Sequence, residues 1–538
     1  MMTELVALLL TTLAPWGPDT APRSSSPPLY DNLGSYHRAI TTKSSMAQKY
    51  FDQGLRLTYG FNHPEAILAF QEASRLDPKC AMCQWGIAYA LGPNINLPMD
   101  ASAVAPAYAA VQKAVALSST GTPAERALIA ALSKRYAKSP PADRSSLDSA
   151  YANAMAQVSA RFPADQDAAT LYAESLLDLS PWNQWTSDGQ PRAGTREAMA
   201  ALERVISINP MHPGACHYYI HTVEASATPE LALPCANRLG SMMPGAGHLV
   251  HMPAHIYLLL GRYDDVIAAN LHAVHSDETY IADRQPSGPY PLIYYSHNIH
   301  FLLVANLLIG NSAEAIAAAN KLATTVPLEA VRAFPLAQYF VPLQETTLAK
   351  FGRWKELLAT PSPPADLPYS VAIWRYTQGL AQAATGDYQA AQASLVAVKS
   401  TDLGDSEPGG PFGPMLLRMV ASDLEGAIAA RQGNWDPAIA SLRQAVAIED
   451  SLGYTEPPWS YYPLRHGLGA ALLKAGRPAE AEAVYREDLW RHRHNGWALY
   501  GLAESLKQQG KAAAADSARA AFKTAWSKAD VDLATLGF

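Results

Sequence analysis

The small and apolar positions of this chain recur with a period of 34 residues. Residues three, four or seven apart share one face of a helix, so each period predicts two amphipathic helices that pack against each other. Small residues and one phenylalanine stand where the two helices would cross, and a proline follows the second helix. In residues 47–80 these positions are Gly54, Ala66, Phe70, Ala73 and Pro78.

The same register continues along the chain and resembles the tetratricopeptide repeat (TPR). Four prolines each close a later unit, and seven glycines each mark a turn between paired helices. They are Pro163, Pro210, Pro244 and Pro327, and Gly261, Gly310, Gly352, Gly386, Gly433, Gly476 and Gly510. From residue 47 onward we expect about twelve units, each stacked only on its neighbours. The sequence therefore predicts an all-α fold, a right-handed superhelical solenoid of TPR-like helix pairs with a concave groove.

Departures from the period suggest loops and boundaries. Extra residues enter at 92–98, 181–191 and 281–290, and insertions in a solenoid become loops that often frame a binding face. The predicted division is a leader and linker at 1–28, N-terminal units at 29–165, histidine-rich central units at 166–330, further units at 331–400, a linker at 401–414 and C-terminal units at 415–538.

Composition narrows the class of protein. Of the 538 residues, 49% are hydrophobic and 17% charged, which suits packed helices and argues against disorder. The net charge of −7, without a basic run, gives no reason to expect nucleic acid as partner. No segment after the leader has the length of a membrane span. The apolar run 5–13 resembles an export signal although Glu4 replaces the usual basic start, so we expect export to the periplasm, with a cytoplasmic location as the alternative.

Histidines provide the candidate chemistry. Ten of the fifteen lie between His212 and His300, and most of these fall in three short clusters. Counted in the TPR register, seven histidines occupy nine places at positions 2, 5 and 9 of the first helices of three successive units. That stripe lines the concave groove of a TPR, so the three rows are predicted to face one place. The seven are His217, His221, His248, His251, His255, His297 and His300.

Clustered imidazoles indicate a transition metal. Seven exceed the three or four ligands of one mononuclear site, which favours two ions, or one ion with histidines left to serve the substrate. Copper, iron and zinc remain open as cofactors. Glu224 is expected to orient imidazoles or to act as a further ligand, and so are Glu174 and Asp178 of the preceding unit.

Other residues receive less specific interpretations. Trp182, Tyr294 and Trp459 are candidates for a substrate wall. Cys80 and Cys83 have the spacing of a redox or zinc pair, but no second pair completes a zinc site, so we interpret them as small buried residues at a helix start. His492 and His494 are read as part of a solvated face.

The chain as a whole is similar to a large bacterial family of TPR proteins with a histidine-rich groove. The likeness covers nearly the whole sequence and rests on segments such as YGFNHPEAILAF, HYYIHTVEAS, PGAGHLVHMPAHIYLLLGRYDD and YYSHNIHF. It implies the TPR fold and no particular reaction. From the residues we expect a metal-dependent enzyme, an oxidoreductase first and a hydrolase second, with a small molecule or peptide as substrate in the groove. The alternative is a TPR scaffold that binds a peptide or protein there without catalysis.

Overall fold

The computed structural model describes residues 26–186, 189–286, 288, 290–404 and 412–534. These residues form helices, and the only β interactions among them are two isolated bridges. The all-α fold predicted from the sequence is therefore confirmed. The apolar run 5–13 and most of the linker 401–414 lie outside the described residues.

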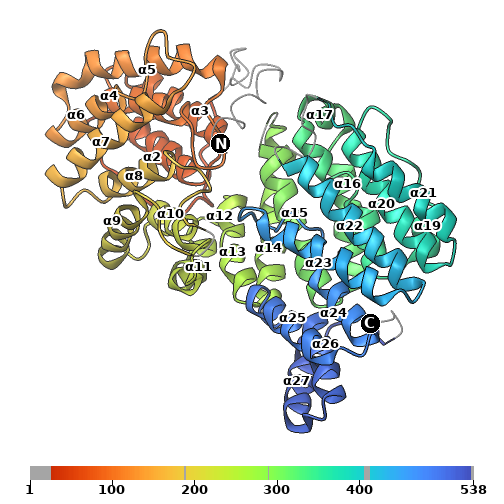
Figure 1. Ribbon diagram of the computed structural model, residues 1–538. Coiled ribbons are helices and arrows are strands. Elements are labelled where there is room, and N and C mark those ends of the chain that lie inside the picture. Colours follow the sequence, from red (N-terminus) through yellow and green to blue (C-terminus); the bar gives the residue numbers. More distant parts are fainter. Residues whose placement is uncertain (1–25, 187–188, 287, 289, 405–411, 535–538) are drawn as a thin grey trace. The chain divides into compact units, whose positions relative to one another are not determined.

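The described chain forms two compact units (Figure 1). The first contains the residues up to Ile256 together with Leu271–Pro291, and the second contains Tyr257–Asn270 and the residues from Leu292 onward. The helices that lie wholly in the first unit are α2 (Ser45–Tyr59), α3 (His63–Leu76), α4 (Ala81–Ala90), α5 (Val104–Leu117), α6 (Pro123–Leu132), α7 (Ser145–Arg161), α8 (Gln166–Leu177), α9 (Thr195–Ile208), α10 (Pro213–Val223), α11 (Leu233–Met242) and α12 (Gly247–His251).

The α2–α3 pair shows why this sequence folds as a TPR-like unit. Ser44 caps the N-terminus of α2, and the Asn62 side chain caps α3. The ring of Phe70 on α3 fills the crossing point, where an added Cβ at Gly54 would lie 2.6 Å away and one at Gly86 of α4 would lie 2.5 Å away. Any larger residue at these two positions would push the helices apart.

The second unit repeats the pairing. Its complete helices are α15 (Ser296–Leu308), α16 (Ser312–Thr325), α17 (Leu328–Ala333), α18 (Leu343–Lys350), α19 (Trp354–Leu358), α20 (Pro368–Ala384), α21 (Tyr388–Lys399), α22 (Gly413–Arg431), α23 (Trp435–Ser451), α24 (Arg465–Lys474), α25 (Pro478–Arg491), α26 (Gly496–Gln508) and α27 (Ala512–Ala525). All seven glycines predicted to mark turns have a φ between 66° and 88°, the left-handed region that favours glycine. Among the described helices, none is both long and apolar enough to cross a membrane.

Two helices continue past the division between the units. They are α13 (Pro253–Leu259) and α14 (Tyr263–Arg284). The predicted insertion at 281–290 therefore begins inside a helix, because α14 runs on to Arg284. The insertion at 92–98 is a loop between α4 and α5, and the one at 181–191 lies between α8 and α9.

Candidate metal centre

Three helices carry the central histidines, all five of which belong to the first unit. His217 and His221 lie one turn apart on α10, which Glu224 ends, and His248 and His251 lie on the short α12. The α10 helix packs against α11, and α11 packs against α12 (Figure 1). The spacing of His248, His251 and His255 predicts one helical row over residues 248–255. The helix instead breaks after His251, because Pro253 has no N–H to continue it, and His255 lies on α13.

Five imidazoles meet in this part of the first unit. Each of the five residues is exposed by 2% or less. The Nε2 atoms of His217 and His248 are 3.2 Å apart, and those of His251 and His255 are 2.7 Å apart. One nitrogen from each of His217, His221 and His248 lies within 4.8 Å of the other two. We call His217, His221, His248, His251 and His255 the histidine cluster.

Oxygen atoms hold three of these rings by their Nδ1 atoms. His217 Nδ1 lies 2.7 Å from the carbonyl oxygen of Tyr59. His221 Nδ1 lies 2.8 Å from Glu224 Oε1, and His255 Nδ1 lies 2.6 Å from Glu224 Oε2. Carbonyl and carboxylate oxygens only accept, so in each ring Nδ1 carries the hydrogen. This arrangement orients metal-bound histidines in many proteins.

The opposite nitrogens of the same rings therefore carry lone pairs. His221 Nε2 is buried and has no hydrogen-bond partner among the described residues. Burial lowers the pKa of His221 to about 3, and burial together with the neighbouring imidazoles holds the pKa of His217 and His248 well below the usual range. The rings are thus neutral at pH 7, the form that binds metal. A metal cation would fit here, because the neighbouring imidazole lone pairs could all coordinate it.

Two aromatic residues pack against the rings of the cluster. The Phe61 ring lies 4.5 Å from the His217 ring and 5.4 Å from the His248 ring, measured between centroids. Trp182, a predicted substrate-wall residue, lies 5.4 Å from the His221 ring. Phe61 has a φ of 55° and Trp182 a φ of 58°, which costs a non-glycine residue about 1 kcal/mol or more. The surrounding packing keeps both residues in this strained backbone and so fixes both rings beside the imidazoles.

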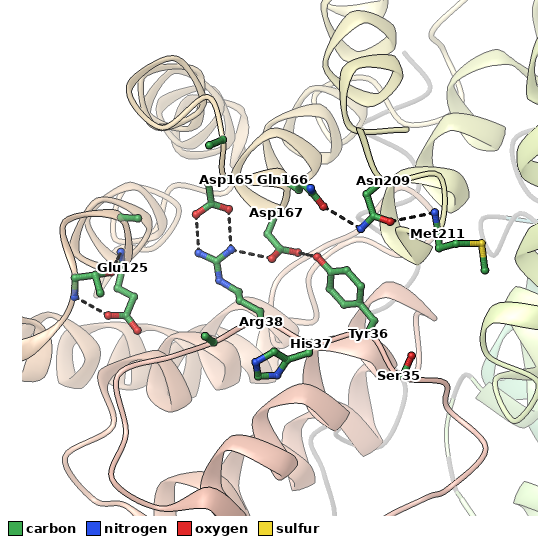
Figure 2. A pocket seen from close by; sticks show the side chains of 14 residues that line it. Ser35, Tyr36, His37, Arg38, Glu125, Asp165, Gln166, Asp167, Asn209 and Met211 are labelled. Atoms are coloured by element: carbon green, nitrogen blue, oxygen red, sulfur yellow. Dashed lines mark hydrogen bonds and ion pairs between the residues drawn. The ribbon is translucent and has the colours of Figure 1, made fainter. Parts of the chain in front are cut away.

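A polar network around Asp167 holds Tyr59, whose carbonyl oxygen bonds to His217, in position. Asp167 accepts hydrogen bonds from the Tyr36 hydroxyl at 2.7 Å, from Arg38 at 2.8 Å and from the Tyr59 hydroxyl. Figure 2 shows Arg38 and Tyr36 converging on this carboxylate at the edge of a cavity of about 580 Å³. His212 lies 3.4 Å from Asp167 and also caps α10. One buried carboxylate thereby ties together the end of α2 and the start of the helix that carries His217 and His221.

The predicted carboxylates of α8 have other partners. Asp178 forms an ion pair with the buried Arg135 and lies beside Glu174. Burial raises the pKa of both carboxyl groups. The structure thus places Glu174 and Asp178 around an arginine, whereas Glu224 touches two imidazoles.

The remaining candidates belong to the second unit. On α15, His297 lies 4.9 Å from the Phe301 ring, and His300 is buried between Tyr339 and Phe340, each 5.8 Å away. Burial lowers the pKa of His300 to about 3. Tyr294 is buried, and Trp459 packs on Tyr339 at 5.4 Å. That His297 and His300 complete the metal site stays a prediction.

All four cysteines are in disulfides. Cys80 and Cys83 are joined at the start of α4, in contrast to the prediction of two small buried residues there. Cys216 and Cys235 are joined as well, which links α10 to α11 directly beside His217. Sequence spacing did not indicate this second pair, because its two cysteines meet only through the packing of two helices.

Comparisons with known proteins leave the function open. The sequence matches no protein-family model and no curated protein. Among solved structures, the chain is similar to the Cut9–Hcn1 complex of the APC/C (12% identity, 91% of this chain and 89% of that chain, TM-score 0.29), to human IFIT1 with PPP-AAAA (12%, 90% and 91%, 0.31) and to yeast Tom70 (12%, 91% and 93%, 0.27). These TM-scores are too low to support any conclusion about function. The assignment as a TPR-like fold rests on the helix pairs of the chain itself.

Proposed function

We propose that the first unit of this protein binds one or two transition metal ions through the histidine cluster. One observation carries the proposal. Three imidazoles have their Nδ1 atoms bonded to oxygen, so their Nε2 lone pairs point into the buried cluster. There His221 Nε2 has no hydrogen-bond partner among the described residues. His217 Nε2 and His255 Nε2 each face another imidazole, whereas a satisfied structural network would also give His221 Nε2 a hydrogen-bond donor.

The donor set narrows the metal and the chemistry. Five imidazoles with one carboxylate bonded to two of them suit copper and zinc better than a di-iron centre, which normally takes several carboxylates. A bound copper or iron ion would supply oxidative chemistry, and a bound zinc ion would supply a Lewis acid for hydrolysis. We favour an oxidoreductase. In either case Glu224 holds two rings in position, while Phe61 and Trp182 exclude water and offer flat apolar faces to a small substrate.

Metal analysis of the purified protein tests the proposal. After growth with copper, iron and zinc supplied, at least one ion per chain is expected, because a folded site of this kind should be occupied. His221→Ala should lose most of it, whereas His494→Ala, at an exposed position, should keep it. Less than about half an ion per chain in the unsubstituted protein would overturn the proposal and leave the peptide-binding scaffold as the better account. A loss in His297→Ala equal to that in His221→Ala would assign His297 to the same centre.

A further inference from the structure

The second unit buries a lysine among groups that can exchange protons with it. Lys350, the last residue of α18, is 8% exposed. Its Nζ lies 2.8 Å from His466 Nδ1. The same Nζ lies 3.9 Å from the centre of the Trp497 ring and 5.0 Å from that of Tyr462. At least one imidazole and two aromatic faces therefore lie around the amine.

The imidazole is held in turn by a buried carboxylate. His466 Nε2 lies 3.2 Å from Asp488 Oδ2, and Asp488 is fully buried. Asn495 donates to the same carboxylate at 2.9 Å, and its own side-chain oxygen accepts from the backbone N–H of Trp497. His492 Nδ1 lies 3.2 Å from the other oxygen of Asp488. The Asn495 amide nitrogen also lies 2.7 Å from His466 Nε2, so the imidazole is held between the lysine amine on one side and an amide and a carboxylate on the other.

A second acidic group approaches the lysine from α20 and α22. The Tyr462 hydroxyl lies 2.6 Å from the Tyr376 hydroxyl, which donates to Asp423 at 2.7 Å. Burial raises the pKa of Asp423 to about 6. The titratable groups around Lys350 among the described residues include His466 on α24, Asp488 on α25, His492 just after α25, Asp423 on α22, and the two tyrosines.

These surroundings favour the neutral amine. Burial lowers the pKa of Lys350 to about 7, and burial together with Lys350 lowers the pKa of His466 to about 4. Although burial opposes it, His466 and His492 hold the pKa of Asp488 well below its usual range. Near pH 7 about half of the Lys350 amines are therefore unprotonated, compared with roughly one in 2,500 for an ordinary lysine.

We propose that Lys350 is the reactive amine of a second site, which takes a small carbonyl compound and condenses with it to a Schiff base. The site lies in the second unit and goes beyond the metal centre. A desolvated lysine is a common nucleophile toward carbonyl carbon. Because only 8% of the residue is exposed, the partner must be small, and the Trp497 and Tyr462 faces favour an apolar one.

The chemistry balances without an oxidant. The Nζ lone pair attacks the carbonyl carbon, a C–N bond forms, and the carbonyl oxygen takes a proton and becomes a hydroxyl group. His466, 2.8 Å from Nζ, accepts the proton that the amine loses. The hydroxyl group then takes a second proton and leaves as water, while the nitrogen gives up its remaining proton and the C=N bond forms, so the two protons that nitrogen loses equal the two that oxygen gains. Overall, lysine amine and aldehyde give imine and one water.

Reductive trapping with propanal tests this site. The full-length protein is incubated with propanal at pH 7.0, imines are reduced with cyanoborohydride, and peptide mass spectrometry measures propylation at each lysine. Lys474 on α24 is exposed and serves as the internal control. Propylation at Lys350 is expected to be at least about 10-fold faster than at Lys474. The fraction of neutral amine differs by ~10³-fold between the two lysines, and burial of Lys350 offsets part of that advantage. Equal or slower propylation at Lys350 would overturn the proposal.

Three further arms separate reactivity from mere accessibility. His466→Gln should slow propylation of Lys350 about 10-fold and leave Lys474 unchanged, since it removes the proton acceptor. Unfolding in urea should abolish the preference for Lys350. Treatment with a metal chelator should leave the preference intact, so that failure of the metal centre and failure of this site are distinguishable. A His466→Gln protein with an unchanged rate at Lys350 would exclude His466 as the proton acceptor.

Discussion

Glu224 holds two imidazoles with one carboxylate, so a conservative substitution at this residue is informative. In Glu224→Gln the side chain keeps its size, but its NH₂ group faces one of the two Nδ1–H groups and cannot accept from it. One ring must turn, and metal affinity should fall about 10- to 100-fold. Competition with a coloured chelator measures this affinity.

A second glutamate near α10 provides the matched control. Glu203 accepts a hydrogen bond from Tyr219 on α10 at 2.8 Å, and within the described part of the chain its carboxylate bonds to no imidazole. Glu203→Gln should bind metal as tightly as the unsubstituted protein. If the two variants lost the same affinity, the effect would come from general loosening of α10, and an orienting role for Glu224 would be excluded.

His221 and His251 should behave as members of one centre. Alanine at either position leaves an incomplete ligand set, so each single variant should lose most of the metal. The double variant should lose little more, which is the non-additivity expected of a shared network. Metal content per chain after dialysis checks this, with His494→Ala as the exposed control. Fully additive losses would indicate two independent sites.

Lys350 should give the second unit an unusual dependence on pH. Its pKa is about 7 in the folded chain and 10.5 for an ordinary lysine, so between these values the unfolded chain binds the extra proton. Stability should therefore rise with pH from 7 to 10.5, by at most about 1.4 kcal/mol per pH unit, and not change from this cause below pH 7. Urea unfolding of the protein and of Lys350→Met measures it. The contribution is absent if both show the same slope.

At the scale of elements, the Cys216–Cys235 disulfide fixes α10 to α11. Its cysteines are 19 residues apart, and closing a loop of that length stabilises the folded state by about 3 kcal/mol. The double variant Cys216→Ser/Cys235→Ser should therefore melt at a lower temperature and release metal more readily. Cys80→Ser/Cys83→Ser is the matched control. It also replaces two buried cysteines with serines, but the disulfide that it removes closes a much shorter loop and does not join α10 to α11. Equal metal release from both variants would contradict a specific role for the α10–α11 link.

The elements also show how far sequence reasoning reaches. The 34-residue period predicted the helix pairs because packing alone fixes residues such as Gly54 against Phe70. The spacing on α10 predicted that His217 and His221 share a face. Phe61 and the Tyr59 carbonyl were missed, since a strained turn and a backbone oxygen leave no side-chain pattern. The reading of His492 as solvated was wrong, because its ring bonds to the buried Asp488.

At the scale of the whole molecule, metal should stabilise the folded chain. An ion that binds only the folded form adds about 2.7 kcal/mol at a free concentration 100-fold above its dissociation constant. Chelation should therefore lower the melting temperature, and resupply of the correct ion should restore it. Calorimetry with copper, iron and zinc in turn identifies which ion restores it most. Melting that ignores both the chelator and every ion would count against the metal centre.

The bond from His217 to the Tyr59 carbonyl joins residues 158 positions apart. Contacts of such sequence separation form slowly, because the long intervening chain must first give up its conformational freedom. During synthesis the α2–α3 pair emerges first and can fold locally, but it must wait for α10 before the first ring is anchored. The Tyr59 anchor of His217 is therefore absent until α10 has been made, and under the proposed metal site we expect metal to load only after the first unit has folded.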